Sequence, residues 1–218
     1  MENYLKIFAI ALLSTLSICQ MYAQENDFRI YAKGGVKFNI IEGLSNTSEL
    51  EIRTKNNTSK LDVVRFNTSF GYKFNKYFST GIGYAFITKP NTTAGTVISN
   101  RYWIDATGSI SASDFSFSLR ERFQQTFALK ECVTLLRSEL KAQYSIPQSI
   151  FKPYISVEPH LFMFNELKGL KEVRYNIGTS IAINKNNDLQ VYGRYTRNYN
   201  QILTSNFFLL GINYYYKF

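Results

Sequence analysis

Residues 205–218 read SNFFLLGINYYYKF, and this last stretch points most directly to the fold. Side chains alternate between the two faces of a β-strand. One face of such a strand would be apolar and aromatic, formed by Phe208, Leu210, Ile212, Tyr214, Tyr216 and Phe218. The other face would be mixed and partly hydrated, formed by Gly211, Asn213, Tyr215 and Lys217. The stretch predicts a strand with one face towards lipid and the other towards water.

The chain ends on an aromatic residue. A terminal strand that closes on Phe218 resembles the C-terminal insertion signal of outer-membrane barrels, carried here by Tyr214, Tyr216 and Phe218. Gly211 lies a residue or two farther from the terminus than the usual glycine of that signal. The resemblance implies that the barrel-assembly machinery is a partner during insertion and that outer-membrane lipid surrounds the folded chain.

The first 24 residues have the features of a secretory signal peptide. Lys6 precedes an apolar run over residues 7–18, and Ala23 is a small residue near an expected cleavage after Gln24. The run is shorter than the roughly 20 residues of a membrane-spanning helix. Ile18 stands where a lipidation motif has a small residue, so lipidation of Cys19 is not expected. The sequence therefore predicts a signal peptide over residues 1–24, a mature domain over 25–218 and export to the bacterial outer membrane.

The composition excludes several classes of protein. The formal net charge is +9, but Lys and Arg are spread singly along the chain, which argues against a nucleic-acid partner. Abundant Tyr and Phe with only 4 Pro favour strands. Cys132 would be the only cysteine left after signal cleavage, so no internal disulfide is expected. A membrane protein with this composition would cross the bilayer with strands.

Alternation of apolar and polar residues recurs along the mature chain. Eleven segments show it, and residues 63–74 show it most clearly. They have the length of about 9 to 11 residues that a tilted membrane strand needs. A soluble periplasmic sandwich, the competing hypothesis, would have strands of about 5 to 6 residues. Short turns such as residues 75–77 alternate with longer connections, of which residues 89–100 form the longest.

The strand count conflicts with a general rule, because single-chain bacterial barrels have even strand numbers. With the C-terminus at the periplasm, counting back eleven strands also places the start of the first strand, Phe28, on the outer side. The prediction is an all-β, antiparallel up-and-down transmembrane β-barrel of about 10–12 strands, with 12 favoured.

Six short segments together resemble a known family. They are Glu49–Thr54 (ELEIRT), Phe70–Tyr77 (FGYKFNKY) with Gly81–Tyr84 (GIGY), Leu119–Phe123 (LRERF), Lys152–Glu158 (KPYISVE) and Gly211–Phe218 (GINYYYKF). This set is similar to the domain of unknown function 2490 family, outer-membrane β-barrel proteins of Bacteroidota. The resemblance covers nearly the whole mature chain, and it implies the barrel and its location but no activity.

Charged residues gather on the strand faces opposite the apolar ones. We expect an ionic network in the lumen, made by Glu49, Glu51, Arg53, Arg65, Arg120, Arg122, Arg137, Glu139, Lys141, Glu158, Arg174 and Arg194. An Arg or Lys that faced lipid at the midplane would cost about 2 to 4 kcal/mol. One hypothesis is that the network fills the lumen, which gives the barrel a structural or narrow passive-passage role. The alternative is a small anion-favouring pore lined by the excess of Arg and Lys.

An enzymatic role is the least supported alternative. His160 is the only histidine, and it shares a strand face with Ser156 and Glu158. A membrane-embedded lipid hydrolase could use His160, but Ser156 lies about 13 Å away along a strand, too far for direct proton transfer. Pro159 suggests a bulge, which leaves the direction of His160 open. We expect no enzyme activity, no cofactor, no metal and a monomer.

Two smaller features concern large aromatic side chains. Tyr102 and Trp103 are expected in the aromatic girdle at the membrane surface. Gly81 and Gly83 lie on a strand face made only of small residues, which predicts that a large group packs against it.

Overall fold

The computed structural model describes residues 27–91, 95–128, 131–164, 169–199 and 206–218, so the predicted signal peptide lies outside the described residues. No helix in these ranges is long and apolar enough to cross a membrane. Every regular element described is a strand. The strands are β1 (Asp27–Ile41), β2 (Leu44–Lys55), β3 (Lys60–Lys73), β4 (Phe78–Asn91), β5 (Gly95–Ala112), β6 (Phe115–Ala128), β7 (Glu131–Tyr144), β8 (Phe151–Met163), β9 (Gly169–Ala182), β10 (Asn187–Asn198) and β11 (Phe207–Lys217).

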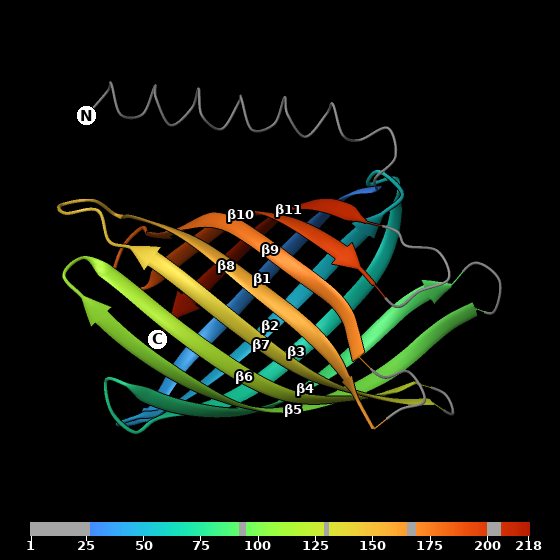
Figure 1. The fold of residues 1–218 in the computed structure, drawn as a ribbon, viewed down its shortest axis with the longest axis horizontal. Helices are drawn as coiled ribbons and strands as arrows, with labels where there is room; N and C mark the ends of the chain where they lie inside the picture. The colour runs from blue at the N-terminus through green and yellow to red at the C-terminus, as the bar shows by residue number, and fades with distance from the viewer. Residues whose placement is uncertain (1–26, 92–94, 129–130, 165–168, 200–205) are drawn as a thin grey trace.

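The strands form one closed barrel in which each strand pairs with its neighbours along the chain, and β1 pairs with β11 to close the ring (Figure 1). β1 and β11 run parallel, with Asp27 opposite Phe207 and Lys37 opposite Lys217. The other pairs are antiparallel, as in β1 with β2 and β10 with β11. The prediction of an all-β barrel is confirmed.

The strand number and direction differ in detail from the expectation. The described chain has eleven strands, within the expected ten to twelve and one fewer than the favoured twelve. The wholly antiparallel arrangement is wrong at β1 and β11. When strands alternate in direction and their number is odd, the first and last point the same way, so the ring can close only through a parallel pair.

The strands are long and strongly tilted, between 11 and 18 residues each (Figure 1). The predicted loop over residues 89–100 is largely wrong, because Lys89 pairs with Val97 and Pro90 with Thr96. β-branched residues in this segment favour the strand, and that preference outweighs its loop-like content of Thr, Asn and Gly.

The terminal strand has the two faces that its sequence predicts. Phe207, Leu209 and Asn213 are buried inside the barrel, whereas Tyr214 and Phe218 are exposed on its outer surface. Tyr216, the third residue of the proposed insertion signal, is exposed beside them. The Phe218 ring stacks on Phe38 at a centroid distance of 4.5 Å, which joins β11 to the end of β1 at the parallel seam.

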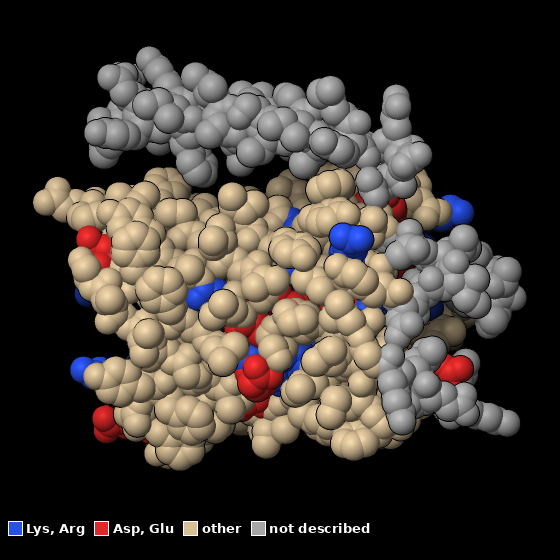
Figure 2. All heavy atoms as spheres, in the orientation of Figure 1, with Lys and Arg blue, Asp and Glu red and all other residues tan. Residues whose placement is uncertain are grey.

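The outer surface is apolar around its middle and aromatic towards both ends. More than half of each of these aliphatic side chains is exposed: Ile82, Ile104, Leu140, Ile155 and Ile177. Aromatic pairs near the C-terminal end include Phe74–Phe78 and Phe115–Tyr144, and Tyr195–Phe208 is a pair near the opposite end. Charged side chains are sparse on the face that Figure 2 shows.

Trp103 lies inside the barrel, so its predicted place in the outer girdle is wrong. Its ring packs against Gly83, where an added β-carbon would overlap it. The prediction of a large group against the small face of β4 is thus confirmed. Tyr102 is 52% exposed on the outer surface. Adjacent residues of a strand face opposite sides, so Tyr102 and Trp103 cannot both face outwards.

Candidate functional site: the charged lumen

The barrel encloses a cavity of about 570 Å³ to which all eleven strands contribute. The structure places every residue of the expected ionic network around it: Glu49, Glu51, Arg53, Arg65, Arg120, Arg122, Arg137, Glu139, Lys141, Glu158, Arg174 and Arg194. Alternation along each strand brings these side chains inside, because each one sits on the face opposite the apolar residues.

Glu51 forms the centre of one charge cluster in the lumen, and it is only 3% exposed. Its carboxylate accepts a hydrogen bond from Arg53 Nε. Lys33 Nζ lies 3.6 Å from Glu51 Oε2, and Arg65 Nη1 lies 3.8 Å from the same oxygen. Three cations from β1, β2 and β3 thus share one buried carboxylate, which offsets part of the cost of burying it.

Glu49 extends this cluster across the parallel seam. Lys33 Nζ of β1 lies 3.0 Å from Glu49 Oε1. The hydroxyl of Tyr215, on β11, donates a 2.5 Å hydrogen bond to Glu49 Oε2 on β2. Because β1 lies between β2 and β11, this contact links the two neighbours of β1 from inside the barrel.

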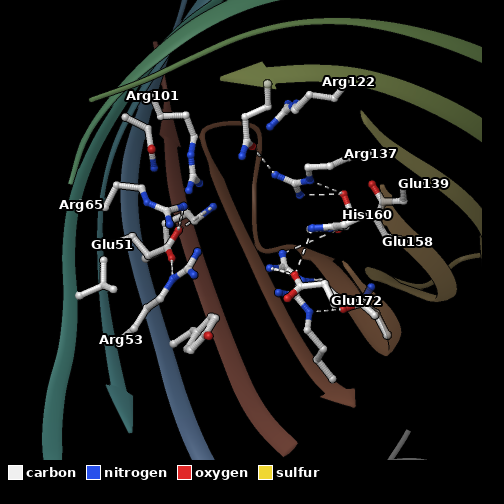
Figure 3. A pocket seen from close by; sticks show the side chains of 18 of the residues that line it. Glu51, Arg53, Arg65, Arg101, Arg122, Arg137, Glu139, Glu158, His160 and Glu172 are labelled. Atoms are coloured by element: carbon white, nitrogen blue, oxygen red, sulfur yellow. Dashed lines mark hydrogen bonds and ion pairs between the residues drawn. The ribbon is translucent and has the colours of Figure 1, made fainter. Parts of the chain in front are cut away.

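Glu158 forms the centre of a second cluster on the opposite side of the lumen (Figure 3). It is 2% exposed. Arg137 Nη2 and Arg120 Nη2 donate to its Oε1 atom at 2.7 and 2.9 Å. Arg174 Nη1 and His160 Nε2 lie 3.8 and 3.1 Å from its Oε2 atom. One carboxylate therefore joins β6, β7, β8 and β9.

His160 faces the lumen, which the sequence leaves open, and it is 2% exposed. Its Nδ1 atom lies 3.1 Å from Glu172 Oε1, and its Nε2 atom lies 3.1 Å from Glu158 Oε2. Ser156 donates instead to Glu139 Oε1 at 3.1 Å. In the described chain, carboxylates rather than a serine hydroxyl flank the imidazole, and it points away from the outer surface. This arrangement gives no support to a lipid hydrolase based on His160.

The cavity lining has a marked excess of positive charge. Among the described residues around it are thirteen Lys and Arg but only six Asp and Glu. The cations outside the expected network are Arg29, Lys33, Lys89, Arg101 and Lys171. Sequence reasoning places Lys89 in a loop and so misses it. The alternating pattern of β5, in which Arg101 shares a face with Trp103, is the signal that could have found Arg101.

A second cavity, of about 470 Å³, lies at the end of the barrel that carries the C-terminus. Its lining is rich in small polar residues, including Ser45, Thr47, Ser69, Thr80, Thr107 and Ser109. Trp103 and Arg122 line both cavities. Arg122 donates to Asp105 Oδ2 from Nε at 2.9 Å and from Nη2 at 2.5 Å, and its guanidinium lies 5.0 Å from the Trp103 ring centroid. Trp103 and Arg122 therefore lie where the two cavities meet, and Asp105 binds Arg122; we call these three residues the partition.

These features define a closed β-barrel with an apolar outer surface and a charged, water-accessible lumen. The chain belongs to the family described as protein of unknown function (DUF2490), which it matches over residues 28–205. The match runs from β1 to β10 and stops before β11. No curated protein matches the chain. The family description names no activity.

Proposed function

We propose that the protein is an outer-membrane β-barrel, exported by a cleaved signal peptide, whose lumen is a narrow passive passage for small anions. One observation carries this proposal. Two polar cavities share Trp103 and Arg122 in their linings, and cations outnumber carboxylates around the larger cavity. Such a lining attracts anions and repels cations.

The outer surface supports the membrane location. Every strand has at least 11 residues, which reaches the length of about 9 to 11 residues that a tilted span needs. An aliphatic belt between two aromatic groups suits a bilayer core between two interfaces. Outer-membrane lipid would surround a monomer, and the barrel-assembly machinery would insert it through the exposed Tyr214, Tyr216 and Phe218. With these residues at the periplasm, Asp27 begins β1 at the outer end.

The proposal is tested by single-channel conductance of the refolded protein in a planar bilayer under a KCl gradient. The expected result is small, stable steps with a reversal potential that shows preference for chloride. Heat-modifiable migration and a β-type circular dichroism spectrum establish that the sample is folded. Silence in such a sample would contradict the passage and leave a closed barrel with a structural role.

Glu121 provides a separate test of the membrane location, because it lies on the outer surface. It shares its strand face with Leu119 and Phe123, and it accepts a 2.6 Å hydrogen bond from Ser138. A carboxylate facing lipid is costly, so Glu121→Gln should raise the free energy of unfolding in phospholipid vesicles by about 1 kcal/mol. The amide keeps an acceptor for Ser138.

The matched control for this measurement is Glu42→Gln, which makes the same change in an exposed turn. Urea unfolding in vesicles, followed by fluorescence of Trp103, compares the two variants. Equal effects of the two substitutions would mean that Glu121 faces water rather than lipid.

A further inference from the structure

Several cations at one end of the larger cavity have no carboxylate partner. Arg101 Nε donates to Thr126 Oγ1 at 2.9 Å. Within the described ranges, no ion pair of 4.0 Å or less includes Arg101, Lys89 or Lys171. The Nε atom of nearby Arg65 is buried and lacks a hydrogen-bond partner in the same ranges. We call Arg65, Lys89, Arg101 and Lys171 the cationic quartet.

The carboxylates closest to the quartet are engaged elsewhere. Glu172 lies 2.5 Å from Arg174 Nη2 and also flanks His160. Asp62 lies 3.4 Å from Lys55 Nζ. Glu51 is shared by three cations, of which Arg65 is the most distant at 3.8 Å. The quartet therefore carries more positive charge than the nearby carboxylates neutralise.

The four side chains line the same cavity, with Arg65, Lys89 and Arg101 on the adjacent strands β3, β4 and β5 and Lys171 on β9. Figure 3 shows Arg65 and Arg101 extending from their strands towards the same region of the lumen. Lys171, on β9, lies close enough for its charge to interact with those of Arg101 on β5 and Lys89 on β4. Converging like charges in a partly dehydrated space repel one another strongly. An anion bound between them would remove that repulsion.

We propose that the cationic quartet is a binding site for a soluble oxyanion that carries two or more negative charges, of the phosphate or pyrophosphate class. The planar guanidinium groups of Arg65 and Arg101 can each donate two parallel hydrogen bonds to such an anion. Lys89 and Lys171 add point charges on the other sides. The inference rests on the proposed function for the route by which the ligand enters.

The position of the site favours a soluble ligand over a lipid headgroup. Each of the eleven strands pairs with a neighbour on both sides, so the wall around the cavity is continuous. A phospholipid outside the barrel would have to cross that wall to reach the quartet. A small anion can enter along the lumen.

The site is tested by titrating inorganic phosphate and pyrophosphate into the folded full-length protein in a neutral detergent, with heat measured by calorimetry. The variant Lys89→Gln/Arg101→Gln removes two quartet charges. The control Lys76→Gln/Arg197→Gln removes the same charges from exposed positions. We expect pyrophosphate to bind more tightly than phosphate, the quartet variant to weaken it by about tenfold or more, and the control to leave it unchanged.

Three results would overturn the site. They are an absence of pyrophosphate binding to the folded wild-type protein, an equal loss in the control variant, and displacement of pyrophosphate by phosphatidylglycerol in mixed micelles. The affinity of Arg101→Lys for pyrophosphate should fall between those of the wild type and the double variant, because lysine keeps the charge but lacks the planar guanidinium group.

Conductance of the same samples separates the two proposals. Binding without conductance overturns only the passage, and conductance without binding overturns only the site.

Discussion

Glu158→Gln is expected to lower the free energy of unfolding by about 3–5 kcal/mol, the cost of leaving buried charges without their partner. Glutamine has nearly the same shape, so the change removes charge and leaves volume. The Arg120 and Arg137 guanidinium groups, which lie 2.9 and 2.7 Å from Glu158, would then repel each other without a carboxylate between them. Urea unfolding in phospholipid vesicles, followed by the fluorescence of Trp103, measures the loss.

Glu131→Gln is the matched control, because Glu131 begins β7 at an exposed position. We expect it to change the free energy of unfolding by less than about 0.5 kcal/mol, as is usual for surface substitutions. A loss below about 1 kcal/mol for Glu158→Gln would show that water or bound ions neutralise the arginines. In that case the Glu158 cluster would not be what joins β6 to β9.

Trp103→Ala is expected to raise the single-channel conductance several-fold. The indole ring lines both cavities, and Gly83 behind it offers no side chain that could take its place. The ion pair between Arg122 and Asp105 would remain, so the widened passage should keep its preference for anions. Planar-bilayer recordings of wild type and variant under identical salt give the comparison.

Tyr102→Ala serves as the control for this experiment. Tyr102 precedes Trp103 on the same strand, but its side chain is exposed on the outer surface. The Tyr102→Ala substitution should therefore leave the conductance unchanged. An equal rise in both variants would indicate general loosening of the barrel. Unchanged conductance in Trp103→Ala would contradict the partition.

The charges of the lumen fall into two groups with different consequences. The carboxylates of Glu51 and Glu158 pair with arginines from several strands, and this pairing holds the wall in register. Arg101 and Lys89 have no such partner within the described chain, and they are the groups available to an anion. Stability and anion recognition can therefore be altered separately by mutation.

Much of the barrel wall was predictable because alternation is a local property of the chain. Phe208 and Ile212 face outwards and Asn213 inwards from the sequence pattern alone. The same rule places Arg120 and Glu158 in the lumen. It fails around Lys89, because the turn-like composition of residues 89–100 hides a weak strand pattern.

The sequence by itself determined the all-β class, the two faces of most strands and most of the charges that line the lumen, since each depends only on neighbouring residues. Only the tertiary structure decided which of those charges meet. Tyr215 and Glu49 are 166 positions apart and come together only because β11 and β2 flank β1. The parallel closure, the partition at Trp103 and the cationic quartet likewise depend on strand number, order and register, which set distances across the barrel that no local pattern records.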